Sequence, residues 1–166
     1  MIRDLSVVPS VMADKQVIKT IATNRRARFE YHIEDTIEAG LVLSGTEVKS
    51  LRAGKASLVD AYASFDRGEA FIYNLQINPY EQGNRNNHPE KRARKLLLHR
   101  VEIDRLMGQV SQKGYTVVAL HMYFKGSRVK IELGLAKGKK SYDKREDIKT
   151  REVKRELDRT IKDSRR

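Results

Sequence analysis

The sequence predicts a mainly β protein whose strands form one small antiparallel barrel. Hydrophobic and polar residues alternate in several short runs, turn residues separate these runs, and helical spacing is confined to two stretches of the body. The 166 residues, 39% of them hydrophobic, suffice for one compact core with an appendage rather than for two cored domains. We therefore expect an OB-like barrel of about six strands with roughly two or three short helices. The strand order does not follow from these patterns.

Five hydrophobic runs predict strands, and they lie at residues 29–33, 59–65, 71–77, 115–124 and 129–135. The run 115–124 is hydrophobic at nearly every position, which is typical of a central strand packed on both faces. A further strand is expected to begin at 40–43. Turn residues at 66–68 and at 125–127 each join two hydrophobic runs, so we expect two hairpins.

Two helices and one long loop complete the predicted body. A helix is expected over 101–112, because four hydrophobic residues fall on one face and Gly114 supplies a stop. A shorter helix is expected over 46–52, followed by Gly54. The stretch 78–91 contains two prolines, one glycine and four asparagines, which indicates a surface loop between strands.

The charge of the chain points to a polyanionic partner. Its 34 Lys+Arg against 22 Asp+Glu give a net charge of +12, which favours nucleic acid. An anionic membrane surface is the main rival, but no basic amphipathic helix with a bulky aromatic face is visible. The absence of cysteine excludes disulfides, thiolate metal sites and a cysteine nucleophile. No export signal is visible either, so we expect a cytoplasmic protein without a membrane partner.

The charge is uneven along the chain, which divides it into three parts. Residues 137–166 hold 13 Lys+Arg and seven Asp+Glu, half of the net charge, with few hydrophobic residues. Such a basic tail should be disordered alone and become helical when a partner contributes binding energy. The alternative is a flexible tail that only aids solubility. We therefore expect a variable N-terminal extension at 1–23, a barrel at 24–136 and this tail.

The sequence offers little sign of catalysis. The four histidines are far apart and form no metal-binding pair, so we expect neither a metal nor a cofactor. Glu47 and Lys49, with Asp35 upstream, match part of a metal-dependent nuclease site, although a charged helix face often produces the same spacing. Glu34 and Asp35 are adjacent, and we expect them at a solvated turn.

Basic residues beside aromatic and hydrophobic ones favour RNA binding. Such groups lie at 24–31, 92–96 and 137–142, where a cation can contact phosphate while its neighbour stacks or packs. No helix-turn-helix, basic zipper or zinc finger is visible, which argues against reading of the DNA major groove. A small barrel with a long loop suits shaped RNA better.

Three strings resemble one protein family closely. They are Glu38-Ala39-Gly40-Leu41-Val42-Leu43 running into Gly45-Thr46-Glu47-Val48-Lys49-Ser50-Leu51-Arg52, then Gly114-Tyr115-Thr116-Val117-Val118-Ala119-Leu120, and Ala136-Lys137-Gly138-Lys139-Lys140 with Asp143-Lys144-Arg145. The chain resembles the small protein B family, the bacterial partners of transfer-messenger RNA in ribosome rescue. The resemblance runs from about Asn24 to the C-terminus and leaves residues 1–23 outside it.

The resemblance implies a monomeric, non-enzymatic adaptor for trans-translation. It implies an OB-like body that binds the transfer-RNA-like part of transfer-messenger RNA, and a tail that enters the empty messenger channel of a stalled ribosome and signals at the decoding centre. Elongation factor Tu with aminoacylated RNA is then an indirect partner. The RNA-binding positions that match are Glu38, Leu97 and Lys130, with Asn24, Arg25 and Arg26 as neighbours. The matching tail positions are Gly138, Lys139, Lys140, Tyr142, Asp143, Lys144, Arg145 and Ile148.

The tail departs from some relatives at three places. Tyr142 stands where some relatives have histidine, Val153 where some have tryptophan, and Thr160-Ile161 replaces an Ile-Met pair. Tyrosine and histidine rings can both stack on a base. Two other functions remain as alternatives, a metal-dependent nuclease and a constitutive structural protein of the ribosome.

Overall fold

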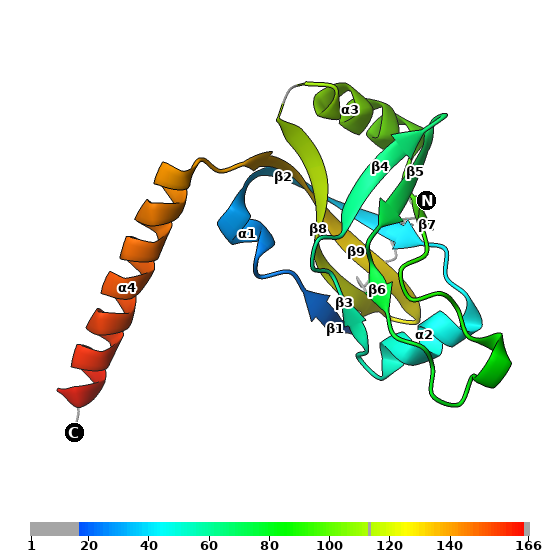
Figure 1. Cartoon of the computed structure of the whole chain (residues 1–166), viewed down its shortest axis with the longest axis horizontal. Coiled ribbons are helices and arrows are strands. Elements are labelled where there is room, and N and C mark those ends of the chain that lie inside the picture. The colour runs from blue at the N-terminus through cyan, green and yellow to red at the C-terminus, as the bar shows by residue number, and fades with distance from the viewer. Residues whose placement is uncertain (1–16, 113, 165–166) are drawn as a thin grey trace, which may run out of the picture.

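A closed antiparallel barrel forms the body of the protein (Figure 1). The computed structural model describes residues 17–112 and 114–164. Within these residues, six strands pair in the cyclic order β8-β4-β5-β7-β2-β9, and pairing of β9 back to β8 closes the ring. The barrel strands are β2 (Tyr31–Leu41), β4 (Tyr62–Asp66), β5 (Glu69–Tyr73), β7 (Arg94–Leu97), β8 (Tyr115–Lys125) and β9 (Arg128–Gly138). The expected barrel of six strands is therefore confirmed.

Three further strands in the described part of the chain lie outside this ring of six. The strand β1 (Ile18–Thr23) pairs antiparallel with β8, so the sheet begins six residues before the predicted barrel start at Asn24. The short strands β3 (Ala56–Ser57) and β6 (Gln76–Ile77) pair with each other as a separate ribbon. The remaining residues predicted as an N-terminal extension, 1–16, lie outside the described residues.

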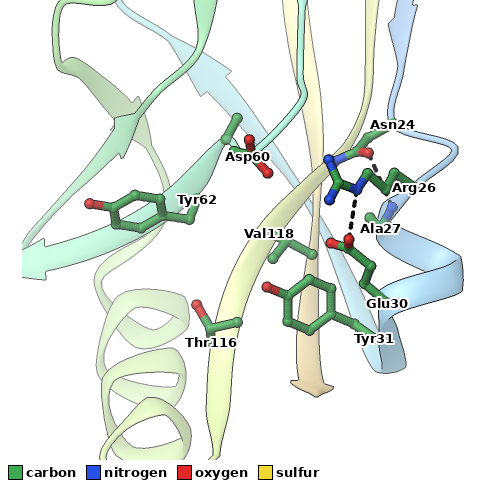
Figure 2. Close-up of a pocket in the computed structure, with 10 residues that line it drawn as sticks. Asn24, Arg26, Ala27, Glu30, Tyr31, Asp60, Tyr62, Thr116 and Val118 are labelled. Atoms are coloured by element: carbon green, nitrogen blue, oxygen red, sulfur yellow. Dashed lines mark hydrogen bonds and ion pairs between the residues drawn. The ribbon is translucent and has the colours of Figure 1, made fainter. Parts of the chain in front are cut away.

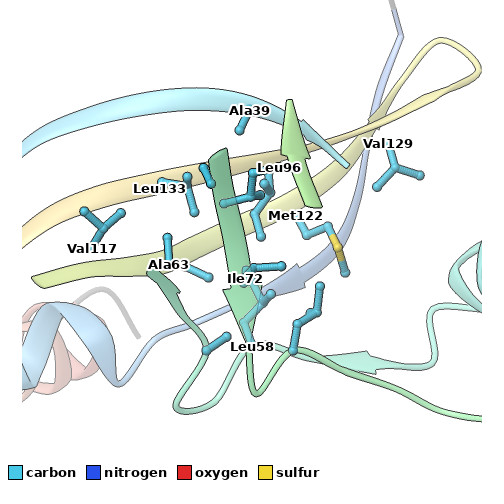
Figure 3. Close-up of a cluster of buried hydrophobic side chains, with 14 of the residues drawn as sticks. Ala39, Leu58, Ala63, Ile72, Leu96, Val117, Met122, Val129 and Leu133 are labelled. Atoms are coloured by element: carbon cyan, nitrogen blue, oxygen red, sulfur yellow. The ribbon is translucent and has the colours of Figure 1, made fainter. Parts of the chain in front are cut away.

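The core fills the barrel interior, as Figure 3 shows. Along β9, buried Val129, Ile131 and Leu133 alternate with polar residues, which is the pattern of a strand with one solvated face. In contrast, β8 buries nearly every residue between Val117 and Phe124, as its hydrophobic run predicts. Packing on both sides of β8 makes it the central strand, paired with β1, β4 and β9.

The helices follow their local signals. Helix α2 (Gly45–Arg52) begins after Ser44, whose backbone N–H donates to the Glu47 carboxylate at 2.8 Å. Helix α3 (Arg100–Val110) buries Ile103 and Leu106 against the barrel, as the predicted helix requires. The expected surface loop is present between β6 and β7, and it contains one 3₁₀ turn at Asn84–Asn86. Both expected hairpin turns are also present, with Gly68 and Gly126 at positive φ.

Three sequence-based expectations about the segment from Phe29 to Gly40 were wrong. A strand face was expected from Phe29, but Phe29 lies in a one-turn helix, α1 (Ala27–Glu30). Glu34 and Asp35 were expected at a turn and a new strand at Gly40, whereas all three residues lie within the single long strand β2. A register shift between Ile33 and Asp35 allows β2 to continue through Glu34 and Asp35 without a turn.

The tail is a long helix that projects away from the barrel, α4 (Ser141–Asp163) (Figure 1). None of its residues is buried. The expected helical form is therefore present, whereas disorder of the isolated tail stays a prediction. No helix in the part of the chain that the structure describes is long and apolar enough to cross a membrane.

Candidate nucleic-acid interface

Residues from four strands meet on one outer face of the barrel. Gly40 of β2 is the register partner of Leu97 on β7 and of Lys130 on β9, and Lys130 is in turn the partner of Tyr123 on β8. Cross-strand partners point to the same side of a sheet, and Glu38 shares that side with Gly40 because it lies two residues away. We call this surface the β2 patch, and it consists of Glu38, Gly40, Leu97, Tyr123, Lys125 and Lys130.

The carboxylate of Glu38 organises the polar half of the β2 patch. It accepts a hydrogen bond from the Tyr123 hydroxyl and two from Lys125 Nζ at 3.1 and 3.2 Å. Lys130 Nζ lies 3.8 Å from the same carboxylate. The Tyr123 hydrogen bond is the largest cause that lowers the pKa of Glu38, and Lys125 and Lys130 lower it further. The patch therefore presents one ionised carboxylate between two lysines, with a net positive charge.

Leu97 supplies the apolar half of the β2 patch. Its side chain is 54% exposed although it belongs to a barrel strand. A Cβ at Gly40 would lie 3.1 Å from Leu97 Cβ, so the missing side chain leaves room for Leu97 over β2. The structure thus brings together the first three predicted RNA-binding residues, Glu38, Leu97 and Lys130, from separate strands. An exposed apolar side chain beside two cations suits a sugar or base next to phosphate.

The other three predicted RNA-binding residues lie elsewhere, at the start of β2. Asn24, Arg25 and Arg26 precede α1, and Figure 2 shows Asn24 and Arg26 beside a cavity between α1, β4 and β8. Seven residues of β2 separate this end from Glu38, which corresponds to about 23 Å along a strand. The two groups therefore do not form one cluster.

Asn24 uses its amide inside the protein. The Nδ2 atom donates to the carbonyls of Leu58 at 3.1 Å and Ala119 at 3.0 Å, and Oδ1 accepts from the N–H of Ala27 at 3.1 Å. Asn24 is buried, so these bonds fix α1 against the barrel. In contrast, Arg26 is exposed and donates to Glu30 at 2.6 Å. Arg25 and Arg26 therefore remain accessible cations, whereas Asn24 is a structural residue that holds α1 on the barrel.

Glu47, the candidate nuclease carboxylate, is fully buried. Arg92 donates to both of its oxygens at 2.8 and 2.6 Å, and Arg94 donates to one at 2.7 Å. Burial alone would raise the pKa of Glu47, but hydrogen bonds from Arg92, the Ser44 N–H and Arg94 together lower it to about 2. Arg94 is also buried and donates to the Leu75 carbonyl at 2.6 Å. Glu47 thus holds α2 against β7 and faces no solvent through which a metal or substrate could reach it.

Asp35 does not join Glu47 in a common site. Its carboxylate pairs with Arg105 of α3 on the outer surface. Within the described residues, no group of three or more histidine, aspartate or glutamate side chains could hold a metal ion. The residues on which the nuclease alternative depended are therefore not brought together.

The predicted tail residues divide into an outward and an inward set. Tyr142, with 66% of its surface exposed, points into solvent next to Arg145 on the following turn. The outward set, all exposed, is Gly138, Lys140, Tyr142, Arg145 and Ile148. Apart from Gly138, which has no side chain, these residues present side chains that are available to a partner.

The inward set contacts the body. Lys139 Nζ donates to the Arg28 carbonyl at 3.1 Å and pairs with Asp147. The Asp143 carboxylate accepts from the Lys140 N–H at 3.3 Å and lies 3.4 Å from His32 Nε2. Lys139, Asp143 and Lys144 are all half-buried, and the contacts to the body come from Lys139 and Asp143.

Sequence reasoning missed Tyr123 and Lys125 as members of the β2 patch. The hairpin turn at 125–127 gives the register Tyr123 to Lys130, so a local signal for Tyr123 existed. The contact of both residues with Glu38 depends on the pairing of β2 with β9, which joins segments about 90 residues apart. No local pattern reports that pairing.

Comparison with known proteins identifies the family. Residues 21–163 match the family model described as "SmpB protein". Relatives named "SsrA-binding protein" are 60% identical over 150 residues in Acetivibrio thermocellus, covering 90% of this chain and 97% of the relative, and 51% identical over 146 residues in Bacillus subtilis, covering 88% and 94%. A solved structure described as "tmRNA-SmpB: a journey to the center of the bacterial ribosome" is 52% identical, with a TM-score of 0.62, and covers 72% of this chain and 84% of its own. The three sequence strings, the closed barrel and these matches agree, and the chain belongs to the SmpB family of SsrA-binding proteins.

Proposed function

We propose that this chain binds transfer-messenger RNA and brings it to stalled ribosomes, where the incomplete peptide is tagged in trans-translation. The observation that carries the proposal is the convergence of Glu38, Leu97 and Lys130 on one exposed patch of a chain that belongs to the SmpB family. The solved relative is described with tmRNA and the bacterial ribosome, which supports the same two partners here. A ribosomal partner supports the cytoplasm as the compartment in which the chain acts, and we include this in the proposal.

The chemistry of the β2 patch fits a folded RNA. Lys130 and Lys125 can neutralise phosphates, and Leu97 can pack on a sugar or base. The ionised Glu38 carboxylate can accept from a base amino group or a 2′-hydroxyl, which the phosphate backbone does not offer. A mixed patch of this kind selects a folded surface rather than any polyanion. Arg25 and Arg26 would extend the contact toward α1.

We assign the tail to the ribosome. Tyr142 can stack on a base, and Lys140 and Arg145 can contact ribosomal RNA phosphates in the empty messenger channel and at the decoding centre. The net charge of the tail supports attraction to that channel. Elongation factor Tu enters as the carrier of the aminoacylated RNA and acts beside this chain.

The adaptor role needs no chemical step from the chain itself. Membership of a family of RNA-binding adaptors supports this, and buried Glu47 gives the nuclease alternative no accessible carboxylate. A constitutive ribosomal structural protein is the remaining alternative. It predicts that the chain stays on ribosomes when no messenger has been truncated, whereas an adaptor accumulates on ribosomes that have stalled.

Separating RNA binding from tagging tests the proposal. The variant Asp143→Ala with Lys144→Ala and Arg145→Ala should keep nearly normal affinity for transfer-messenger RNA while peptide tagging on truncated messengers collapses. The matched control Asp158→Ala with Arg159→Ala and Lys162→Ala removes the same charges farther along α4 and should tag much better. Equal losses of binding and tagging in the first variant would contradict the division between barrel and tail.

A further inference from the structure

We propose that contacts between α1 and the first turns of α4 form a latch that sets the direction and the rotation of α4 relative to the barrel. The latch consists of Phe29, His32, Lys139, Asp143, Asp147 and Arg151, with the carbonyls of Arg28 and Glu30. Its side chains are then positioning residues for the tail, which act through geometry rather than by touching the ribosome. This inference rests on the proposed function.

Lys139 is the pivot of the latch. Its backbone N–H donates to the Glu30 carbonyl at 2.9 Å, and its Nζ donates to the Arg28 carbonyl at 3.1 Å. The same ammonium group pairs with Asp147 in the second turn of α4, and the Lys139 side chain is 10% exposed. The resulting hydrogen bond lowers the pKa of Asp147. Lys139 therefore connects the end of β9 to α1 and α4 through three contacts. Because two of these contacts use its ammonium group, that group is poorly placed to bind an RNA phosphate.

Two more contacts lie on the same side of α4. The Asp143 carboxylate lies 3.4 Å from His32 Nε2 of β2, and the Arg151 guanidinium lies 5.5 Å from the centre of the Phe29 ring. Asp143, Asp147 and Arg151 are spaced four residues apart, so they form one stripe along the helix. Three successive turns are thereby attached to the body, and Figure 1 shows α1 between the barrel and α4.

The stripe determines which residues α4 presents to a partner. At about 100° per residue, Tyr142 lies about 140° around the helix from Asp147, and Arg145 about 160°. Turning Asp147 toward α1 therefore turns Tyr142 and Arg145 away from the body, as their exposure shows. Beyond Arg151, every described residue of α4 is exposed. The latch thus orients the ribosome-facing side of the first turns, while the distal half of the helix forms no part of the latch.

Paired variants with no net change of charge test the latch. Asp147→Asn with Arg151→Ala removes the contacts to Lys139 and Phe29. The control, Asp158→Asn with Arg155→Ala, removes the same groups from the exposed half of α4. Both full-length variants and the unaltered chain are assayed for affinity to transfer-messenger RNA and for peptide tagging on stalled ribosomes.

Tail orientation is measured independently in the same complexes. The chain contains no cysteine, so Ser127→Cys on the barrel and Thr160→Cys on α4 give unique sites for a pair of spin labels. The distance distribution between them in the complex with transfer-messenger RNA and the stalled ribosome reports the direction of α4. Arg151→Lys, which keeps a cation over Phe29, serves as the conservative variant.

The latch predicts a specific combination of results. In the paired latch variant the distance distribution broadens and tagging falls roughly fivefold, since the lost cation–π and ion-pair contacts are weak individually. The control and Arg151→Lys keep the narrow distribution, and RNA affinity is unchanged throughout. A broadened distribution with normal tagging, or equal losses in the latch and control variants, would overturn the latch. Absence of RNA binding by the unaltered chain would instead remove the proposed function.

Discussion

Replacing Glu47 by glutamine should destabilise the protein without changing its shape. The substitution keeps the volume of the side chain but removes the charge that Arg92 and Arg94 contact. The new amide nitrogen would also face N–H donors of the two arginines and of Ser44. The Arg94 guanidinium would then remain buried without an anionic partner, and an unpaired buried charge is strongly destabilising.

The magnitude follows from the pKa of Glu47. A folded-state pKa of about 2 in place of the ordinary 4.5 corresponds to roughly 3 kcal/mol of stability at neutral pH. Removing one partner of a buried pair costs about 3–5 kcal/mol, in the same range. For a chain of this length, such a loss lowers the melting temperature by roughly 10 °C.

The pH dependence gives the sign of the effect. Because the pKa of Glu47 is depressed in the folded state, its contribution is present above about pH 4.5 and is lost as the pH falls toward 2. The free energy of unfolding of Glu47→Gln should therefore lie well below that of the unaltered chain at neutral pH, and the difference should shrink on acidification.

Urea unfolding followed by circular dichroism, at neutral pH and at several values down to about pH 3, measures this difference. Glu81→Gln, which removes an exposed partner of Lys55, is the control and should change stability little. An unfolding midpoint of Glu47→Gln equal to that of the unaltered chain at neutral pH would refute the reasoning.

Three further substitutions test separate parts of the structure. Lys130→Ala should weaken binding of transfer-messenger RNA and lower the slope of log affinity against log salt by about one, in a titration at several salt concentrations; an unchanged slope would place Lys130 off the interface. Asn24→Ala should lower the free energy of unfolding by about 2–4 kcal/mol, since three buried hydrogen bonds are lost. The same variant should barely alter RNA affinity, and a large loss of affinity in the folded variant would make Asn24 a direct contact. Gly134→Ala should lower the free energy of unfolding by about 1–3 kcal/mol in a urea titration, because its Cβ would lie 2.8 Å from Leu120 Cδ1. Unchanged stability would mean that Leu120 can move aside without cost.

The barrel was predictable because hydrophobic and polar residues alternate along a strand that has one buried and one solvated face. This holds for β9, and the unbroken hydrophobic run of β8 marked it as central. The prediction failed at β7, where Arg94 occupies an inward position and breaks the hydrophobic pattern. The distant Glu47 supplies the anionic partner of this buried arginine, and no local pattern links the two residues. In β2, the adjacent acids Glu34 and Asp35 interrupt the alternating pattern, so one long strand was predicted as two. The structure accommodates them with a register shift beside Asp35.

The candidate interface was predictable in its residues but not in its arrangement. Family resemblance supplied Glu38, Leu97 and Lys130, and their convergence around Gly40 needed the strand pairing. Resemblance also grouped Asn24 with Arg26, although the two side chains differ in burial and in role. The tail showed the same limit, because side-chain type does not reveal whether a lysine faces α1 or solvent.

Selective recognition of one folded RNA is the central claim, and a competition titration tests it most directly. The full-length chain is titrated with labelled transfer-messenger RNA and then with ordinary transfer RNA at the same near-physiological salt concentration. Markedly tighter binding of transfer-messenger RNA is the expected result. Equal affinity for the two RNAs would mean that the barrel responds to polyanion charge alone, and the claim would fail.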